Sequence, residues 1–330
     1  MRAIRFPEQN AIEVTELSDP AASPGEVVVQ VRASGLCHTD IEVLKGNYGT
    51  GAYPLVPGHE YAGVVVEVGP EVESVAIGDH VAIDPNLNCG NCVNCGKGWV
   101  HLCDALGAYG VTTNGGFAEL SAVNADAVHS IGDLPFELAA LAEPIGCVLN
   151  GVDMAYEPHQ RHALIFGAGP MGLLLGLVLQ ARGIGEVTLV EPADARRNLA
   201  TTLGMSALAP GDIDLHGMAQ SIDYVADATG RANVVADALG YVAPGGTFHM
   251  FGVCPPSARV ELSPFDIFRR QLRIVGSHSL NRNIPESLKI VQELQPELDQ
   301  LVSHRLSLDE MADVFRDGLP ANALKLQVTL

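Results

Sequence analysis

Four cysteines stand close together in the first third of the chain. Two residues separate Cys89 from Cys92 and Cys92 from Cys95, and Cys103 follows eight residues later. Four thiolates at this spacing in one loop suit a closed tetrahedral zinc site, which is structural because no position remains for substrate. An iron–sulfur cluster also takes four cysteines, but its usual spacings differ. A nucleic-acid zinc ribbon is disfavoured by the acidic chain, and a decayed site by the presence of all four cysteines.

A second group has the residue types of a catalytic metal site. Cys37 and the adjacent pair His59 and Glu60 offer a thiolate, an imidazole and a carboxylate, all of which are zinc ligands. A catalytic zinc has about three protein ligands and one open position for water or substrate. On spacing alone, a buried cysteine and an ordinary core or surface histidine explain these residues better.

Glu143 interrupts an apolar stretch. Residues 134–149 have a helical pattern that we expect to break at Glu143-Pro144. A charge there costs stability unless it is paired or bound to metal. The alternative, a surface glutamate that happens to precede proline, is equally compatible with the spacing.

A glycine motif follows in the middle of the chain. A strand is expected at 163–166, then Gly167-x-Gly169-x-x-Gly172, a helix to about residue 182, and a second strand at 187–190 that ends on Glu191. This context predicts dinucleotide binding, with the pyrophosphate at the helix N-terminus and Glu191 on the adenosine ribose hydroxyls. The alternative is a glycine-rich turn in an ordinary βαβ unit.

Composition narrows the class of protein. The 330 residues suffice for one or two domains, and 47% hydrophobic residues with 35 glycines suit an α/β protein. The net charge of −20 argues against nucleic acid and anionic membranes as partners, and solubility is its simplest explanation. No membrane span or signal peptide is expected, so the chain is interpreted as cytoplasmic. The odd number of cysteines, seven, and the clustering of four of them favour metal over disulfides.

The remaining segments predict two kinds of architecture. Strand candidates at 27–31, 64–69 and 78–82, with a glycine turn and strand at 111–120, predict a β-barrel-like N-terminal unit. Alternating elements after the glycine motif predict a doubly wound parallel sheet. They are helices at 193–203 and 232–239, and strands within 221–230, 245–252 and 272–277. Helical signals then continue from 285 to a final strand at 324–329.

Together these motifs resemble the zinc-dependent medium-chain dehydrogenase/reductase superfamily over essentially the whole chain. The motifs that carry the resemblance are Cys37-His38-Thr39-Asp40, Gly58-His59-Glu60, Gly78-Asp79-x-Val81, the four clustered cysteines, Gly115-Gly116-Phe117-Ala118-Glu119 and the glycine motif. Within it, Glu60 and Glu143-Pro144 resemble the sorbitol (polyol) and threonine dehydrogenase branches.

The resemblance implies a fold and an activity. It implies a GroES-like β-barrel catalytic domain at 1–149 and 275–330, and a Rossmann NAD-binding domain at 150–274. It further implies a homodimer or homotetramer that oxidises a secondary hydroxyl of a pentitol or hexitol to a ketose. L-threonine, a glucose-type sugar and a simple alcohol are alternative substrates. A catalytically inactive dinucleotide-binding scaffold is the alternative that is not an enzyme.

The resemblance also implies roles for individual residues. Cys37 and His59 become ligands of a catalytic zinc, Glu60 a direct or outer ligand, and Glu143 a neighbour of the metal. Thr39 becomes the hydroxyl that passes on the substrate proton. Cys89, Cys92, Cys95 and Cys103 become the ligands of a second, structural zinc. The expected NAD-binding residues are Gly167, Gly169, Pro170, Met171, Gly172, Glu191, Arg196, Thr229 and Gly252.

One position departs from the family. Many relatives have a proton-relay histidine three residues after Thr39, where this chain has Glu42. Either Glu42 relays the proton, or water does, or the pathway differs, or Glu42 is a solvated surface residue.

Overall fold

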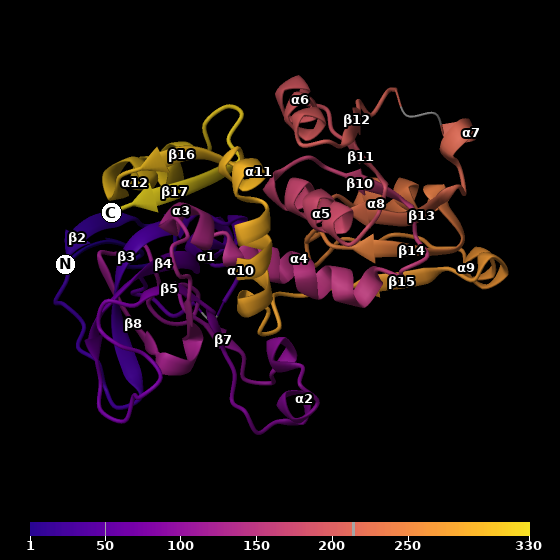
Figure 1. Ribbon diagram of the computed structural model, residues 1–330. Helices are drawn as coiled ribbons and strands as arrows, with labels where there is room; N and C mark the ends of the chain where they lie inside the picture. Colours follow the sequence, from indigo (N-terminus) through magenta and orange to yellow (C-terminus); the bar gives the residue numbers. More distant parts are fainter. Residues whose placement is uncertain (50, 213–214) are drawn as a thin grey trace. The chain divides into compact units, whose positions relative to one another are not determined.

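A computed structural model describes residues 1–49, 51–212 and 215–330. The chain forms two compact units, one made of Met1–Gly146 with Leu280–Leu330 and the other of Cys147–Ser279 (Figure 1). The predicted domain boundaries differ from these by three residues (149 against 146) and by five (275 against 280). We keep the assignment of a catalytic and a cofactor domain to these ranges as a proposal.

The first unit is built on a mainly antiparallel sheet. Its strands follow the order β16-β17-β3-β4-β5-β9, and β8 also pairs with β3. Their bounds are β3 Glu26–Gly35, β4 Glu60–Val68, β5 His80–Ile83, β8 Leu120–Asn124, β9 Val128–Ser130, β16 Val302–Leu306 and β17 Lys325–Thr329. The strands predicted at 27–31, 64–69, 78–82 and 324–329 are therefore confirmed within a few residues. The strand predicted within 111–120 is wrong in extent, because β8 begins only at Leu120 and turns and loop precede it.

Shorter elements complete this unit. They are β1 Arg2–Arg5, β2 Glu13–Glu16, α1 His38–Leu44, β6 Asn86–Leu87, α2 Val93–Gly96, η1 Val100–Leu102, β7 Gly107–Ala108, η2 Ala125–Ala127, α3 Phe136–Ala139, α10 Ile284–Glu293, α11 Gln295–Asp299 and α12 Leu308–Asp317. Alternate residues of β3, among them Val27, Val29 and Val31, pack in one buried cluster with Tyr61 and Val65 of β4. This two-residue period is what a strand imposes on its side chains.

The predicted break in the helix after residue 134 lies earlier than expected. α3 ends at Ala139 and α4 runs from Ala142 to Ala155, so Glu143 and Pro144 lie in the first turn of α4. Proline is tolerated there because the N–H groups of the first helical turn have no partner within the helix. The stretch Phe136–Ala155, which covers α3 and α4, has the length and apolarity of a membrane span. However, 83% of its most apolar window is buried in the protein, as in a core helix.

The second unit contains a parallel sheet of six strands. Their order is β12-β11-β10-β13-β14-β15, and every pairing is parallel. The strands are β10 His162–Phe166, β11 Glu186–Val190, β12 Ser206–Leu208, β13 Ile222–Asp227, β14 Val242–Met250 and β15 Arg273–Gly276. The helical elements are α5 Pro170–Ala181, α6 Asp194–Thr202, α7 Leu215–Met218, α8 Ala232–Ala238, η3 Leu239–Tyr241 and α9 Pro264–Arg270. The predicted doubly wound sheet is confirmed, and its direction of winding reverses between β10 and β13, where such sheets bind ligands.

Candidate functional site

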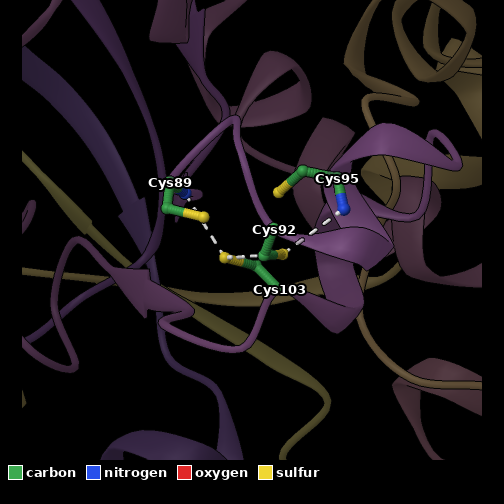
Figure 2. A group of neighbouring side chains, drawn as sticks. All are labelled: Cys89, Cys92, Cys95 and Cys103. Atoms are coloured by element: carbon green, nitrogen blue, oxygen red, sulfur yellow. Dashed lines mark hydrogen bonds between the residues drawn. The ribbon is translucent and has the colours of Figure 1, made fainter.

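The four clustered cysteines converge on one point in the first unit (Figure 2). Cys89 follows β6, Cys92 caps the N-terminus of α2, Cys95 lies on α2, and Cys103 follows η1. Their sulfur atoms all lie within 4.8 Å of one another, and none of the four forms a disulfide. The short helical turns thus bring together the four sulfur ligands that a tetrahedral metal site needs.

Backbone N–H groups stabilise the charged form of two of these thiols, Cys92 and Cys103, whereas burial and the neighbouring Cys92 raise the pKa of the Cys95 thiol to about 11. The Cys103 Sγ accepts from the N–H of Cys89 at 3.3 Å and of Ala105 at 3.4 Å. Backbone N–H groups of Cys95 and Asp104 lower the pKa of the Cys92 thiol to about 6. Since the thiolate is the metal-binding form of cysteine, this donor set fits a structural zinc.

A second convergence in the same unit involves Cys37, His59 and Glu60. Cys37 is the N-cap of α1, His59 directly precedes β4, and Glu60 is the first residue of β4. One ligand atom of each lies within 4.8 Å of the other two. The structure therefore brings together three of the four residues that the sequence proposes around the catalytic zinc, the fourth being Glu143.

Asp40 links the two segments that supply these ligands. It is fully buried, and its carboxylate accepts the N–H of Cys37 at 2.9 Å and of Gly58 at 3.1 Å. Its Oδ1 also lies 3.3 Å from Nδ1 of His59. A carboxylate behind a metal-binding histidine fixes the orientation of the ring and makes it a stronger ligand. In the sequence, Asp40 stands in the motif Cys37-His38-Thr39-Asp40, which does not indicate this role.

The negative charges around His59 favour a positive charge at this position, either on the imidazole itself or on a metal ion. Burial alone lowers the pKa of the imidazole, but the charges of Asp40 and Cys37 outweigh burial and raise it well above its ordinary value. A buried imidazole between anionic groups fits a metal ion, because the ion would supply the positive charge that those groups favour.

Lys325 is a member of this site that the sequence analysis missed. It lies on β17, is 3% exposed, and its ammonium group donates to both carboxylate oxygens of Glu60. Burial lowers the pKa of Lys325, but Glu60, Cys37 and Glu143 together raise it, so the side chain is charged. Lys325, Gln327 and Thr329 alternate with apolar residues in the last strand, so the sequence pattern does not mark Lys325 as a member of a buried site.

The other residues predicted near the catalytic metal take different positions. Glu143 is nearly buried in the first turn of α4, and its charge acts on Lys325. Among the described residues it does not join the three-residue metal group. Thr39 lies half-buried on α1, two residues after Cys37. Their proposed roles beside metal and substrate stay predictions.

Glu42 lies on α1 and is engaged by its neighbours. Its carboxylate accepts hydrogen bonds from Lys45 at 3.0 Å and from Asn47 at 2.9 Å. These two contacts lower the pKa of the Glu42 carboxyl. Their exposed geometry favours the interpretation of Glu42 as a surface residue that tethers the end of α1.

Gly35 makes room for the Glu60 carboxylate, and this leads to a prediction. A Cβ at position 35 would lie 2.4 Å from the Oε2 of Glu60. We expect Gly35→Ala to lower the free energy of unfolding by about 2 kcal/mol, as overpacking of a filled core does, and to weaken zinc binding. Thermal unfolding and zinc content measure both effects. Gly185→Ala is the control, because a Cβ there meets no atom within 4 Å. Equal melting temperatures for the two variants would contradict the prediction.

The predicted glycine turn lies between β10 and α5 in the second unit. Gly167 has a φ of +100°, which side chains other than glycine rarely adopt. Gly169 is the N-cap of α5, with Pro170 and Met171 in the first turn. A Cβ on Gly172 would lie 2.0 Å from the carbonyl oxygen of Gly167. Gly167 and Gly172 therefore meet separate steric requirements, whereas a Cβ on Gly169 would come no closer than 3.9 Å to another residue. The turn leads into a helix N-terminus suited to phosphate.

Glu191 braces this turn from the end of β11. It is nearly buried, its Oε2 accepts the N–H of Ala168 at 2.9 Å, and its Oε1 accepts that of Ala193 at 3.0 Å. The contact of Glu191 with a ribose stays a prediction. Its two bonds to backbone N–H groups are a structural role that the sequence did not predict.

Arg196 of α6 approaches the turn, with its Nη1 3.9 Å from the position of a Cβ on Gly169. Thr229 and Gly252 lie after β13 and β14, at the same carboxyl edge of the sheet.

Comparisons with known proteins show the family of the chain. The family profile described as "Alcohol dehydrogenase GroES-like domain" matches residues 23–133, and "Zinc-binding dehydrogenase" matches residues 170–293. D-altritol 5-dehydrogenase of Agrobacterium fabrum is 50% identical over 319 residues, covering 96% of this chain and 95% of the relative. D-arabinitol dehydrogenase 1 of Uromyces fabae is 31% identical, covering 99% and 97%.

A solved structure extends the likeness to the fold. A zinc-binding dehydrogenase from Sinorhizobium meliloti 1021, solved with bound NADP, is 32% identical and has a TM-score of 0.96, with 100% of this chain and 99% of that chain covered. The chain is thus an enzyme that belongs to the family of zinc-dependent medium-chain dehydrogenases, with a GroES-like and a Rossmann-type part.

Proposed function

We propose that the protein oxidises a secondary hydroxyl of a pentitol or hexitol to a ketose and transfers the hydride to NAD. The observation that carries the proposal is the Cys37, His59 and Glu60 cluster in a chain that is 50% identical to a D-altritol dehydrogenase. The resemblance of Glu60 and Glu143-Pro144 to the polyol and threonine dehydrogenase branches supports a polyol substrate and makes L-threonine the first alternative. L-threonine, a glucose-type sugar and a simple alcohol are the alternatives that the test must separate.

The residues of the first unit have distinct parts in this mechanism. Cys37 and His59 would hold a catalytic zinc, with Glu60 as a direct or outer ligand. When bound, zinc polarises the substrate hydroxyl and lowers its pKa. Thr39 accepts the proton of that hydroxyl and passes it toward solvent. Asp40 orients the His59 ring, and Lys325 holds Glu60 in place through its two carboxylate oxygens.

The second zinc and the cofactor have other partners. Cys89, Cys92, Cys95 and Cys103 would hold the structural zinc. The glycine turn would hold NAD, whose nicotinamide accepts the hydride. We propose NAD rather than NADP because the buried Glu191 carboxylate would repel a 2′-phosphate.

A variant of Glu191 tests this cofactor choice. We expect Glu191→Ser to lower the kcat/KM ratio of NAD over NADP by about tenfold or more, since the loss of like-charge repulsion is worth more than about 1.4 kcal/mol. The melting temperature should also fall, because the carboxylate bonds to Ala168 and Ala193 are lost. Glu186→Ser is the matched control at an exposed position on β11. An unchanged cofactor ratio would refute the role of Glu191.

We also propose a cytoplasmic homodimer or homotetramer without nucleic-acid or membrane partners. The net charge of −20 supports the last two points. Phe265 and Phe268 of α9 are 71% and 79% exposed, and β15 is an edge strand of the described sheet. Exposed apolar side chains and unpaired strand edges favour association. Light scattering of the purified protein would give its mass in solution, and a monomer would contradict the proposal.

The substrate is tested by NADH formation with a panel of compounds. The panel holds pentitols and hexitols, including D-altritol and D-arabinitol, together with L-threonine, glucose and simple alcohols. We expect the highest kcat/KM for one polyol. The highest value for threonine, glucose or an alcohol would move the enzyme to the corresponding alternative. A zinc-loaded protein that binds NADH and oxidises none of them would favour the scaffold.

A further inference from the structure

One buried carboxylate holds the loop that follows β13. Asp227, the last residue of that strand, is fully buried. Its Oδ1 accepts the N–H of Thr229 at 2.9 Å and the Thr229 hydroxyl at 2.6 Å, and its Oδ2 accepts the N–H of Gly230 at 3.1 Å. Three donors on one carboxylate fix both the backbone and the side chain of this loop.

The same residue also holds the loop after the neighbouring strand β14. The carbonyl oxygen of Asp227 accepts the N–H of Phe251 at 3.1 Å and of Gly252 at 2.6 Å. A Cβ on Gly252 would lie 2.4 Å from the nitrogen of Gly230 and 2.9 Å from the Oδ2 of Asp227. The two loops therefore pack backbone against backbone around Asp227.

The loop after β13 also touches the glycine turn. Ala228 donates its N–H to the carbonyl oxygen of Phe166, the last residue of β10, at 2.9 Å. The Thr229 methyl lies 3.1 Å from the position of a Cβ on Gly167. A displacement of this loop would therefore change the packing around Gly167, the first glycine of the turn.

The Thr229 hydroxyl is occupied within its own loop. It donates to Asp227 and accepts the N–H of Arg231 at 3.1 Å. The sequence predicts Thr229 as a cofactor-binding residue, but in the structure its hydroxyl donates its proton to Asp227. This hydrogen bond helps to fix the conformation of the loop.

We propose that Asp227 is a positioning residue for the dinucleotide: its carboxylate and carbonyl set the loops at 228–230 and 251–252 beside the glycine turn. These loops lie at the carboxyl ends of β13 and β14, next to the reversal between β10 and β13 where doubly wound sheets bind dinucleotides. The inference rests on the proposed binding of NAD by this unit, and it does not depend on the substrate that is oxidised.

Asp227→Asn tests the proposal in the full-length, zinc-loaded protein. Asparagine offers one acceptor oxygen in place of two and points an amide donor at an N–H donor. Hydrogen bonds to a charged group are stronger than those between neutral groups, so we expect NADH binding, measured by its fluorescence, to weaken about tenfold or more. The KM for NAD should rise in parallel, while zinc content and kcat at saturating NAD change little.

Asp223→Asn is the matched control. Asp223 lies on the same strand near its opposite end, where its Oδ2 accepts the N–H groups of Arg161 at 2.8 Å and His162 at 3.1 Å. The same substitution there removes a comparable anchor far from the carboxyl edge. We expect it to lower the melting temperature while the dissociation constant of NADH stays within about twofold of wild type.

Thr229→Val keeps the test valid if Asp227→Asn does not fold. Valine retains the shape of threonine and removes only the hydroxyl that donates to Asp227. We expect it to weaken NADH binding by about threefold to tenfold, because one hydrogen bond to a charged group is lost.

NADH binding within about twofold of wild type in every folded variant of Asp227 and Thr229 would overturn the proposal. So would equal weakening by Asp223→Asn. A wild type that binds NADH but oxidises no polyol refutes only the proposed substrate, whereas a wild type that does not bind NADH overturns both.

Discussion

We expect His59→Ala to abolish the proposed polyol oxidation while NADH still binds. The substitution removes one of three ligands from the Cys37, His59 and Glu60 cluster, and it leaves the Asp40 carboxylate without the imidazole beside it. Changes to groups that merely support metal ligands already cost roughly 10–100-fold in metal affinity or activity. We therefore expect a larger loss from the ligand itself. Zinc content should fall from two ions per chain to one, and NADH fluorescence should report an unchanged dissociation constant.

Two further variants calibrate this result. Asp40→Asn keeps the imidazole and weakens its support, so we expect an intermediate loss of about 10–100-fold. His162→Ala changes a half-exposed histidine of the second unit that pairs with Glu186, and it should leave activity unchanged. Activity in His59→Ala near that of wild type, with two zinc ions still bound, would show that the cluster is not the catalytic metal site.

We expect Cys103→Ser to destabilise the loop between β6 and β7. Cys103 is the most buried of the four clustered cysteines, and its sulfur accepts backbone N–H groups from both Cys89 and Ala105. This loop has little apolar core, so a structural zinc supplies folding free energy directly. We expect one zinc ion to be lost per chain, a lower melting temperature, and faster proteolysis between residues 86 and 108.

The control for this variant is another free cysteine. Cys254 is half-buried in the second unit and lies outside the four-cysteine cluster. Cys254→Ser should keep two zinc ions and nearly the melting temperature of wild type. If Cys103→Ser behaved in the same way, the four cysteines would not form a structural metal site.

The parts of the fold that the sequence predicted well are local in the chain. β10, the glycine turn, α5 and β11 follow one another within 29 residues (162–190), and hydrophobic runs and glycines mark each of them. The four cysteines likewise lie within 15 residues (89–103), where short turns bring the sulfur atoms together. Patterns of this kind depend on the chain geometry between near neighbours, which spacing alone encodes.

The parts that escaped prediction depend on distant residues. Lys325 and Glu60 are 265 positions apart, and they meet only because β17 pairs with β3 and β3 with β4. No periodicity within either strand encodes that pairing. The support that Asp40 gives to His59 likewise requires α1 to dock against the start of β4. For Glu191, the strand and glycine pattern predicts an acid that binds a ribose. The pattern does not predict the bonds from Ala168 and Ala193, which the structure shows.

Metal content measured together with activity tests the central claim most directly. The purified protein is assayed for NADH formation from its best polyol, before and after a chelator removes zinc and again after zinc is restored. We predict that activity disappears as zinc leaves the Cys37 and His59 site and returns with it, while NADH binding persists throughout. Full polyol oxidation by protein that holds no zinc at this site would contradict the account.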